Sequence, residues 1–440
     1  MTDQRGNIPG LVHFVCQDYV GITRGRGMAR ERLASQLSKG VGWVPANIGL
    51  NPFGEITDNP WGPVGDLLLM PDRDAEVFVS GADGTSPLHY FLSDIVTLDG
   101  APWEACPRHY LKQQIAALDR LGLRVVASFE HEFMVTDIEN PPPPFSLAAA
   151  RSEERLCTDI HEALDEAGIE PEMCLAEYAP RQFEVTCRPA DALRAADRAV
   201  SVREVVREIC RRHGRQVSFS PKLANNAGTN GVHIHLSLWS ADGQPLTYDS
   251  RRPGGLSELA SQFTAGIHAH LPALTALTAP GVVSYQRLRP HSWTAAYACV
   301  GDRNREASLR IAPINATNGA DPARQANIEY RPADALASPY LALGALLAAG
   351  IDGLRTRRTL PALVNVEPGT IPEAEYERYG MSVLPGDLAA AMAAFGRDDV
   401  LRATLDPRLI GCYERIKESE LHAMADKDDQ AICRDYARIY

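Results

Sequence analysis

Residues 232–238 read Val-His-Ile-His-Leu-Ser-Leu and alternate apolar and polar side chains without a break. Because successive side chains of a β-strand point to opposite faces, we expect His233, His235 and Ser237 to share one face. Glycine-rich residues 226–231 come directly before this stretch and indicate a loop that leads into the strand. On its own, the pattern also fits a half-buried antiparallel strand whose polar face meets water.

Three other stretches with strand character carry carboxylates. These are Glu130 and Glu132 in residues 125–135, Glu177 and Glu184 in or beside residues 178–187, and Glu329 in residues 327–331. Five carboxylates and two imidazoles on strand faces are an unusual way to build a solvated surface. Hard divalent cations prefer carboxylate oxygens and accept imidazole. The pattern therefore predicts a polar cavity that binds divalent metal ions.

Composition is that of an ordinary soluble globular protein. The chain has 440 residues, of which 45% are hydrophobic and 23% charged, which predicts two to three domains or one large and one small domain. The formal net charge of −12 argues against general binding to nucleic acid, which needs a basic surface.

Three features predict a cytoplasmic protein that does not cross a membrane. The first residues lack the apolar segment of a secretion signal. The longest apolar run, near residues 340–351, is too short for a bilayer and predicts a buried core helix. The nine cysteines are scattered without a Cys-x-x-Cys motif, as expected for reduced thiols in the cytoplasm.

We expect a β-rich N-terminal domain, residues 1–103, and a larger domain, residues 104–440. The first should contain strands at 11–16 and 66–69, a turn at 70–72 that ends the second strand, and a long loop at 45–63. In the second, apolar periodicity predicts helices at 110–122, 153–167, 188–212 and 257–271. The sequence Arg-Pro-Ala-Asp-Ala-Leu occurs at 188–193 and again at 331–336, and indicates the same strand-to-helix junction twice.

Residues 285–313 are rich in arginine and are expected to bind anions. The arginines are Arg287, Arg289, Arg303, Arg305 and Arg310, of which we expect only Arg289 to be simply solvated. Guanidinium groups match phosphates and carboxylates. With Lys222 and the carboxylates, they predict metal-bridged phosphates and phosphoryl transfer. The chain has neither a P-loop motif nor the protein kinase motifs.

Five motifs, in order and at near-family spacing, resemble the glutamine synthetase family over nearly the whole chain. They are Glu130-His-Glu132, Glu177 with Gln182-Phe-Glu184, Pro221-Lys222 before His233, Asp302-Arg-Asn-Arg305 with Arg310, and Glu329-Tyr-Arg331. The resemblance implies an α+β fold with a small N-terminal β-grasp-like domain and a large catalytic domain, whose curved antiparallel sheet is flanked by helices. It also implies a ring-shaped homo-oligomer, expected to be a dodecamer, with active sites shared between neighbours.

The resemblance implies a role for each site residue. One metal site would use Glu132, Glu177 and Glu184 and the other Glu130, His233 and Glu329, with two or three Mg²⁺ or Mn²⁺ ions per active site. The implied nucleotide contacts are Lys222, His235, Ser237, Arg305 and Arg310. The implied substrate contacts are Gly228, Arg287 for the α-carboxylate of glutamate, and Arg331 for its γ-carboxylate. The implied catalytic residues are Arg287, Arg305, Arg310 and Arg331.

The family's chemistry uses ATP as co-substrate. It phosphorylates the γ-carboxylate of glutamate, and an amine then attacks the acyl phosphate. Two departures concern the amine. Where the family has a flap glutamate six residues after the counterpart of Arg287, this chain has Trp293, and the stretch 47–54 has no acid before Glu55. Desolvated ammonium needs carboxylate partners, whereas an indole suits an alkyl or aryl amine or a cation.

The sequence therefore predicts a ligase that joins glutamate to an organic amine, with Trp293 among its substrate-binding residues. The alternative is an ordinary ammonia-dependent glutamine synthetase, in which Trp293 fills a structural gap and Glu55 or Asp58 replaces the missing acid. A catalytically dead relative and a guanidino kinase are disfavoured, because all six matched metal ligands are present. Ala227 stands where the family has an asparagine near glutamate, so a related acid substrate stays open.

Overall fold

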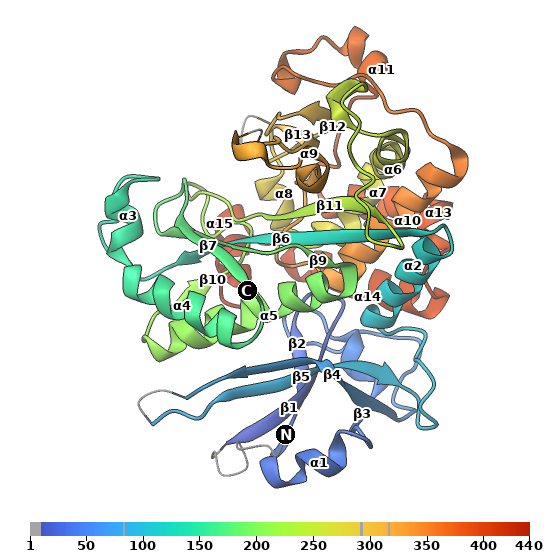
Figure 1. Ribbon diagram of the computed structural model, residues 1–440. Helices are drawn as coiled ribbons and strands as arrows, with labels where there is room; N and C mark the ends of the chain where they lie inside the picture. The colour runs from blue at the N-terminus through green and yellow to red at the C-terminus, as the bar shows by residue number, and fades with distance from the viewer. Residues whose placement is uncertain (1–9, 82–83, 291–293, 316) are drawn as a thin grey trace.

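The computed structural model describes residues 10–81, 84–290, 294–315 and 317–440. Its N-terminal part is a five-stranded sheet in the order β2-β1-β5-β4-β3, at the bottom of Figure 1. The elements are β1 (Leu11–Gln17), β2 (Thr23–Ala29), α1 (Leu33–Gln36), β3 (Val41–Trp43), β4 (Leu67–Val79) and β5 (Leu88–Val96). Strands β1 and β5 are parallel and the other neighbours antiparallel. The predicted strand at 11–16 and the long loop after residue 45 are both present.

One boundary in this sheet was predicted wrongly. The turn residues at 70–72 do not end the second strand, because β4 continues through Pro71 to Val79. The β4–β5 register shifts between Pro71 and Glu76, which marks a bulge or irregularity. A bulge is one of the few places in a sheet where proline is tolerated.

The C-terminal part is built on a ten-stranded sheet. Eight strands follow the order β15-β12-β13-β14-β11-β6-β8-β7, and β9 and β10 each pair with β6. The strands are β6 (Leu123–Val135), β7 (Pro171–Ala176), β8 (Gln182–Cys187), β9 (Ala190–Asp191), β10 (Val217–Ser218), β11 (Val232–Ser240), β12 (Tyr297–Asp302), β13 (Ala307–Ile311), β14 (Ile328–Tyr330) and β15 (Ser382–Val383). All pairings are antiparallel except that of β12 with β13.

Helices cover this sheet and fill the region between the two domains. Before β11 they are α2 (Pro107–Asp119), α3 (Leu147–Ser152), α4 (Glu154–Glu166) and α5 (Ala192–Arg212). After it come α6 (Glu258–Ala269), α7 (Leu271–Thr278), α8 (Ser284–Arg287), α9 (Pro322–Gln325), α10 (Pro339–Thr356), α11 (Tyr376–Tyr379), α12 (Leu388–Gly396), α13 (Asp399–Arg402), α14 (Pro407–Met424) and α15 (Asp429–Ala437). Helices α2 and α5 contact both β6 and the N-terminal sheet, so they separate the two sheets (Figure 1).

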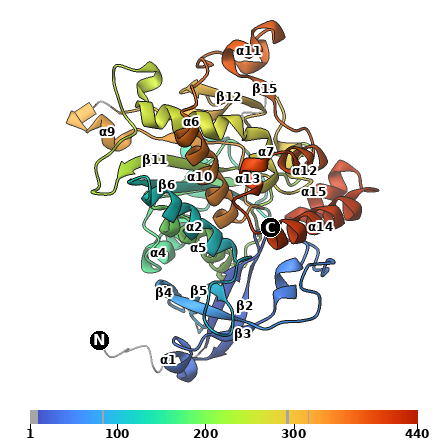
Figure 2. The same cartoon turned by 90° about the vertical axis from the view of Figure 1, so that its right-hand side faces the viewer.

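The helix predictions agree with α2, α4 and α6, whereas α5 begins later than predicted, at Ala192 after β9. The apolar run near 340–351 is indeed the buried part of α10. This helix packs against α2 and α6, as Figure 2 shows from the side. None of the helices in the described residues combines the length and apolar character needed to span a membrane. Together with the sheets, these helices confirm the predicted α+β fold.

The repeated Arg-Pro-Ala-Asp-Ala-Leu sequence does not form the same junction twice. At 188–193 it passes through β9 into α5, which begins at Ala192. At 331–336 no helix follows until Pro339, because the second copy forms a buried turn. In that turn Asp334 accepts a hydrogen bond from the backbone of Leu336, and the carbonyl of Ala333 accepts one from Val232.

Candidate active site

Strand register gathers the predicted metal ligands on one face of the large sheet. Glu130 of β6 lies opposite His233 of β11, and Glu132 lies opposite Glu184 of β8. On the far side of β11, His235 lies opposite Glu329 of β14. Residues directly opposite each other in a ladder share a face, as do residues two apart along a strand. The alternation in residues 232–238 therefore does belong to a polar face that is shared by four strands.

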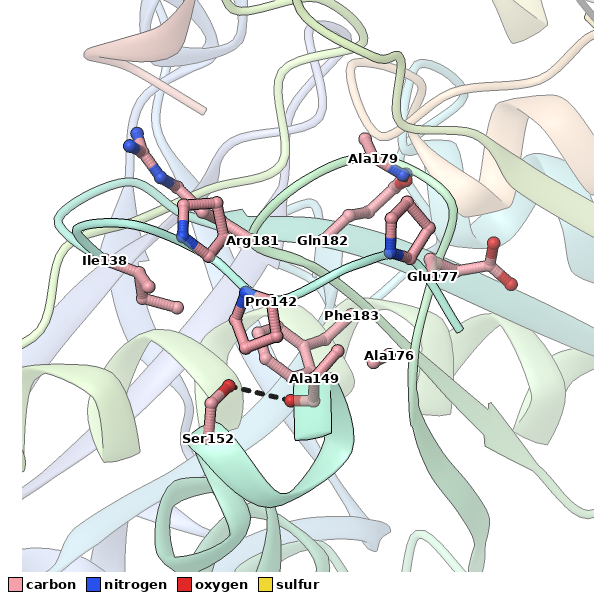
Figure 3. Close-up of a pocket in the computed structure, with 12 residues that line it drawn as sticks. Ile138, Pro142, Ala149, Ser152, Ala176, Glu177, Ala179, Arg181, Gln182 and Phe183 are labelled. Carbon is pink, nitrogen blue, oxygen red and sulfur yellow. Dashed lines mark hydrogen bonds between the residues drawn. The ribbon is translucent and has the colours of Figure 1, made fainter. Parts of the chain in front are cut away.

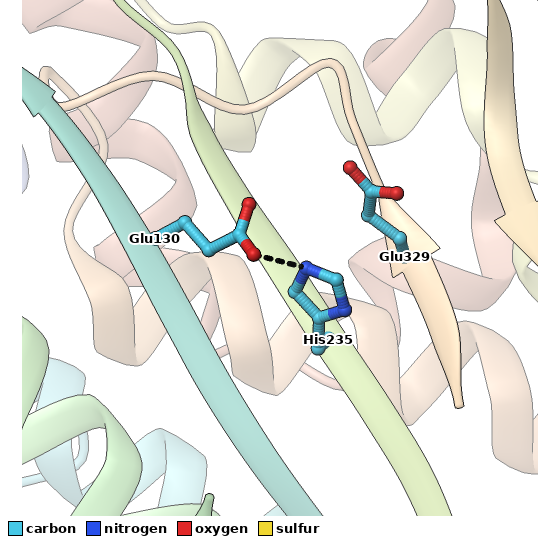
Figure 4. A group of neighbouring side chains, drawn as sticks. All are labelled: Glu130, His235 and Glu329. Carbon is cyan, nitrogen blue, oxygen red and sulfur yellow. Dashed lines mark ion pairs between the residues drawn. The ribbon is translucent and has the colours of Figure 1, made fainter. Parts of the chain in front are cut away.

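Two groups of ligand atoms lie within 4.8 Å of one another in the described residues. One group is Glu130, His235 and Glu329, shown in Figure 4, and the other is Glu130, Glu184 and His233. Glu130 is common to both, with its carboxylate oxygens 3.2 Å from Nδ1 of His233 and 3.0 Å from Nε2 of His235. The structure thus brings His235, which the resemblance assigned to the nucleotide, next to the metal-ligand candidates.

The carboxylates of this face are crowded and poorly hydrated. Burial, followed by the negative charges of Glu130 and Glu132, raises the pKa of Glu184 to about 9. Burial likewise raises the pKa of Glu132 to about 7 and shifts the pKa of Glu177 upward. Carboxylates that resist ionisation together require a compensating cation. The donor set, oxygens with an imidazole at their centre, fits a hard divalent metal ion.

Next to these groups lie Glu329 and His235, whose pKa values are shifted in opposite directions. Burial opposes ionisation of Glu329, but Arg331, His233 and His235 lower its pKa to about 2. Burial opposes protonation of His235, yet its contact with Glu130 raises its pKa to about 9. The Nδ1–H of His235 donates to Oδ1 of Asn327 at 2.8 Å. His235 is therefore held in place by Glu130 on one side of its ring and Asn327 on the other.

The predicted arginines differ in burial. Arg310 donates to Oε2 of Glu329 at 2.6 Å, and Arg331 donates to the other oxygen of the same carboxylate. Arg287 is buried, and its two terminal nitrogens donate to the backbone carbonyls of residues 331–333 at 3.0–3.1 Å. Arg305 is exposed. Its carbonyl accepts a hydrogen bond from Nε of Arg331, which fixes the turn that carries it.

A glutamine and a glycine join two parts of the site: the loop of residues 222–231 between β10 and β11, in which the sequence predicts a substrate contact (the substrate loop), and the sheet face that carries the predicted metal ligands (the metal face). Nε2 of Gln182 donates to Glu132 at 3.0 Å, to the carbonyl of Thr229 at 2.8 Å and to Oδ1 of Asn230 at 3.1 Å. At Gly228 an added Cβ would lie 2.2 Å from the Cβ of Ala179, so only glycine fits this approach. Gln182 was part of the recognised motif, but the hydrogen bonds by which it links Glu132 to residues 229 and 230 were not predicted.

A cavity opens beside the metal face. It is a cavity of about 240 Å³ whose lining includes Ser128, Glu130, His235, Ser237 and Trp239. The indole Nε1–H of Trp239 donates to Oγ of Ser237 at 2.9 Å, and the guanidinium of Arg324 lies 5.7 Å from the indole ring centre. Trp239 was not predicted as a site residue, although it continues the alternation of 233, 235 and 237 by one more step.

Lys222 lies apart from that cavity, on the substrate loop. Its Nζ donates to the carbonyl of Ala227 at 3.3 Å. Burial lowers its pKa, while the nearby Cys433 acts in the opposite direction. Cys433 belongs to α15, so the predicted nucleotide lysine lies between the substrate loop and the last helix of the chain.

The residues that decide the amine are only partly described. Trp293 lies outside the described residues. In the N-terminal stretch, the buried Asn51 accepts hydrogen bonds from the backbone of Phe53 and Glu55, and its amide donates to the Glu55 carboxylate and to Ser419 of α14. Glu55, which the sequence suggested as a replacement acid, is thus bound within its own loop, and Asn51 links that loop to α14.

Comparison with known sequences identifies the class of protein. The glutamine synthetase N-terminal domain profile matches residues 4–103, and the glutamine synthetase catalytic domain profile matches residues 104–436. The chain belongs to the glutamine synthetase family. It is a carbon–nitrogen ligase of that family, which uses ATP and divalent metal ions.

Relatives of both kinds considered above are similar to this chain. Gamma-glutamylpolyamine synthetase GlnA3 of Streptomyces coelicolor is 35% identical over 455 residues, covering 100% of this chain and 96% of the relative. The glutamine synthetase of Pyrococcus abyssi is 30% identical over 405 residues, covering 90% and 87%. A crystal structure described as a novel glutamine synthase homolog superposes with a TM-score of 0.91 at 46% identity, covering 98% of both chains.

Proposed function

We propose that this protein joins the γ-carboxylate of glutamate to an organic amine through a γ-glutamyl phosphate, with conversion of ATP to ADP and phosphate. The observation that carries the proposal is the amine side of the site. Residues 289–294 read Arg-Pro-His-Ser-Trp-Thr without a carboxylate, and the first acid of the N-terminal stretch, Glu55, is bound to Asn51. The full-length similarity to a gamma-glutamylpolyamine synthetase supports it.

In the proposed reaction, Glu130, Glu132, Glu177, Glu184, His233 and Glu329 would hold the divalent ions. When bound, the ions would neutralise charge on the phosphates during transfer. Arg310 and Arg331 orient Glu329 through charge-assisted hydrogen bonds and present guanidinium groups to the same face. His235 lines the cavity in which we propose that ATP lies, with its phosphates toward Glu130.

We assign the remaining contacts by position. Ser237 would contact the nucleotide, Lys222 and Arg305 would approach the phosphates, and Gly228 would offer its backbone to glutamate. Arg287 would attract the α-carboxylate of glutamate. Its carbonyl partners at residues 331–333 hold the guanidinium in place, a preorganised positive charge of the kind that such recognition uses.

A competition experiment tests the proposal. With ATP, Mg²⁺, glutamate and equal concentrations of ammonium and a mixture of organic amines, mass spectrometry should find a γ-glutamyl amide of an organic amine as the main product. Glutamine as the sole product would favour the ammonia-dependent alternative. In the same assay Trp293→Glu should shift the product ratio toward glutamine by about 10-fold or more, because a carboxylate partner favours desolvated ammonium. An unmoved ratio would remove Trp293 from the amine site.

A further inference from the structure

Phe145 and Tyr178 form an exposed aromatic pair beside Glu177, one of the predicted metal ligands. Their side chains are 59% and 69% exposed, with ring centres 6.2 Å apart and planes inclined by 40°. Leu147, which begins α3, is 77% exposed and lies two residues further along the chain. Large apolar side chains gathered on a surface generally mark a binding site.

The backbone holds this pair outward. Phe145 has a φ of +54°, a left-handed conformation that aromatic residues rarely adopt, directly after four prolines whose φ is fixed. Ser146 secures the turn, because its hydroxyl donates to the carbonyl of Pro143 at 2.7 Å and accepts from the backbone of Ala149 at 3.0 Å. Backbone strain of this kind accumulates at functional sites.

The same pair is tied to the metal face through Glu177. The backbone N–H of Tyr178 donates to Oε2 of Glu177 at 2.9 Å. Figure 3 shows that Pro142, of the segment that leads to Phe145, lines the same small pocket as Glu177 and Arg181. The aromatic pair is thus one residue away from Glu177, a member of the predicted metal-ligand set.

An extended amine matches this surface. Its methylene chain gains by leaving water against the rings, and a second ammonium gains from the ring faces. Among the described residues that line the small pocket, Arg181 is the one cation, and it donates to the carbonyl of Thr136 at 3.4 Å. Ammonia and methylamine have no chain to place on the rings.

We propose that Phe145 and Tyr178 are specificity-determining residues that bind the hydrocarbon chain of the amine, and that they select long alkylamines and diamines over short ones. This inference rests on the proposed function, because it assigns part of the same amine site.

Steady-state phosphate release with a series of linear diamines and alkylamines, starting at methylamine, tests it. In the unmodified protein, kcat/KM should rise by roughly 2- to 4-fold per added methylene, the gain expected when a methylene group leaves water. Phe145→Ser and Tyr178→Ser should flatten this dependence, while kcat/KM for methylamine and KM for glutamate and ATP change less than about 2-fold. Phe145→Leu should give an intermediate dependence because part of the apolar area remains.

Leu98→Ser is the matched control, since Leu98 is 65% exposed in the other domain. Three results would overturn the inference. A chain-length dependence that survives both serine variants would do so while leaving the proposed function intact. Equal loss with all amines, accompanied by a change of oligomeric state in size-exclusion chromatography, would make the pair a contact between copies of this chain. Reaction with ammonia alone in the unmodified protein would instead refute the proposed function itself.

Discussion

Glu329 is the residue on which the charge balance of the site depends. It is 1% exposed and accepts hydrogen bonds from Arg310 and Arg331, while its carboxylate lies within reach of His233 and His235. A buried carboxylate with two guanidinium partners is already well compensated. Its value to the site is therefore geometric, because it places a ligand oxygen and two cations on the same face.

Removing this carboxylate should abolish ligation. Glu329→Ala should lower both Mn²⁺ affinity in isothermal titration calorimetry and phosphate release by roughly 100-fold or more, since even outer partners of metal ligands cost 10- to 100-fold. Glu162→Ala, an exposed glutamate of α4, serves as the control. Full activity with unchanged Mn²⁺ binding would contradict the assignment of Glu329 as a ligand.

The substrate loop also depends on Gly228, because this residue packs directly against Ala179. Gly228→Ala should displace the substrate loop, raise KM for glutamate more than KM for ATP, and destabilise the fold by about 1–3 kcal/mol, the cost of overpacking. The double variant Gly228→Ala with Ala179→Gly removes the Cβ that lies 2.2 Å from the added one, and should restore most of the affinity. Absence of any rescue would show that the contact with Ala179 is not what requires glycine.

Sequence reasoning predicted these residues as far as local pattern allows. A two-residue period assigns Glu130 with Glu132, and His233 with His235, to common faces. It does not give the register between strands, so it could not foresee that Glu130 touches both histidines. Nor could it place Arg287 against the carbonyls of residues 331–333, which are distant in the sequence and come close only through folding.

Among the elements, α6, α7, α10 and α13 are joined by one histidine. His270, between α6 and α7, has Nδ1 2.6 Å from Asp398 and Nε2 3.3 Å from Asp352 of α10. Asp398 also caps α13 by accepting from the backbone of Leu401. Burial opposes protonation of His270, but the two carboxylates prevail and raise its pKa.

This arrangement predicts a pH-dependent contribution to stability. Because the folded state binds the proton of His270 more tightly than the unfolded chain, the contribution is complete below the ordinary pKa of about 6.5 and is lost as pH rises through the raised folded value. The melting temperature of the protein should therefore exceed that of His270→Asn by more at pH 6 than at pH 9. His422→Asn, at an exposed histidine, is the control. An equal difference at both pH values would contradict this account.

Elements whose apolar residues recur at a regular spacing could be predicted, whereas short or irregular elements could not. Helices α2, α4 and α5 followed from apolar spacing, whereas β7, with exposed and half-buried residues on both faces, had no pattern to reveal it. Strand β4 was cut short because Pro71 resembles a turn signal, and only the pairing with β5 shows that the strand continues. Tertiary pairing overrides local preference in such cases.

At the scale of the whole molecule, buried polar contacts fix the two domains to each other. Arg108 of α2 donates to Asp197 of α5 at 2.8–2.9 Å, to Asp94 of β5 at 3.1 Å and to Asp72 of β4 at 2.7 Å. At the chain end, the hydroxyl of the buried Tyr440 donates to the carbonyl of Val20 at 2.6 Å. The N-terminal loop at 45–63 contacts α14 through the amide of Asn51, which donates to Oγ of Ser419 at 3.0 Å. The ring-shaped dodecamer stays a prediction of family membership.

The central claim, ligation of glutamate to an organic amine, is tested most directly by phosphate release from ATP at fixed Mg²⁺ and glutamate. The panel should hold ammonia, alkylamines, ethanolamine, diamines and anilines. The account predicts that kcat/KM for the best organic amine exceeds that for ammonia by roughly 10- to 200-fold, the discrimination that one or two apolar contacts provide. Ammonia as the preferred substrate would contradict it and make this protein an ordinary glutamine synthetase.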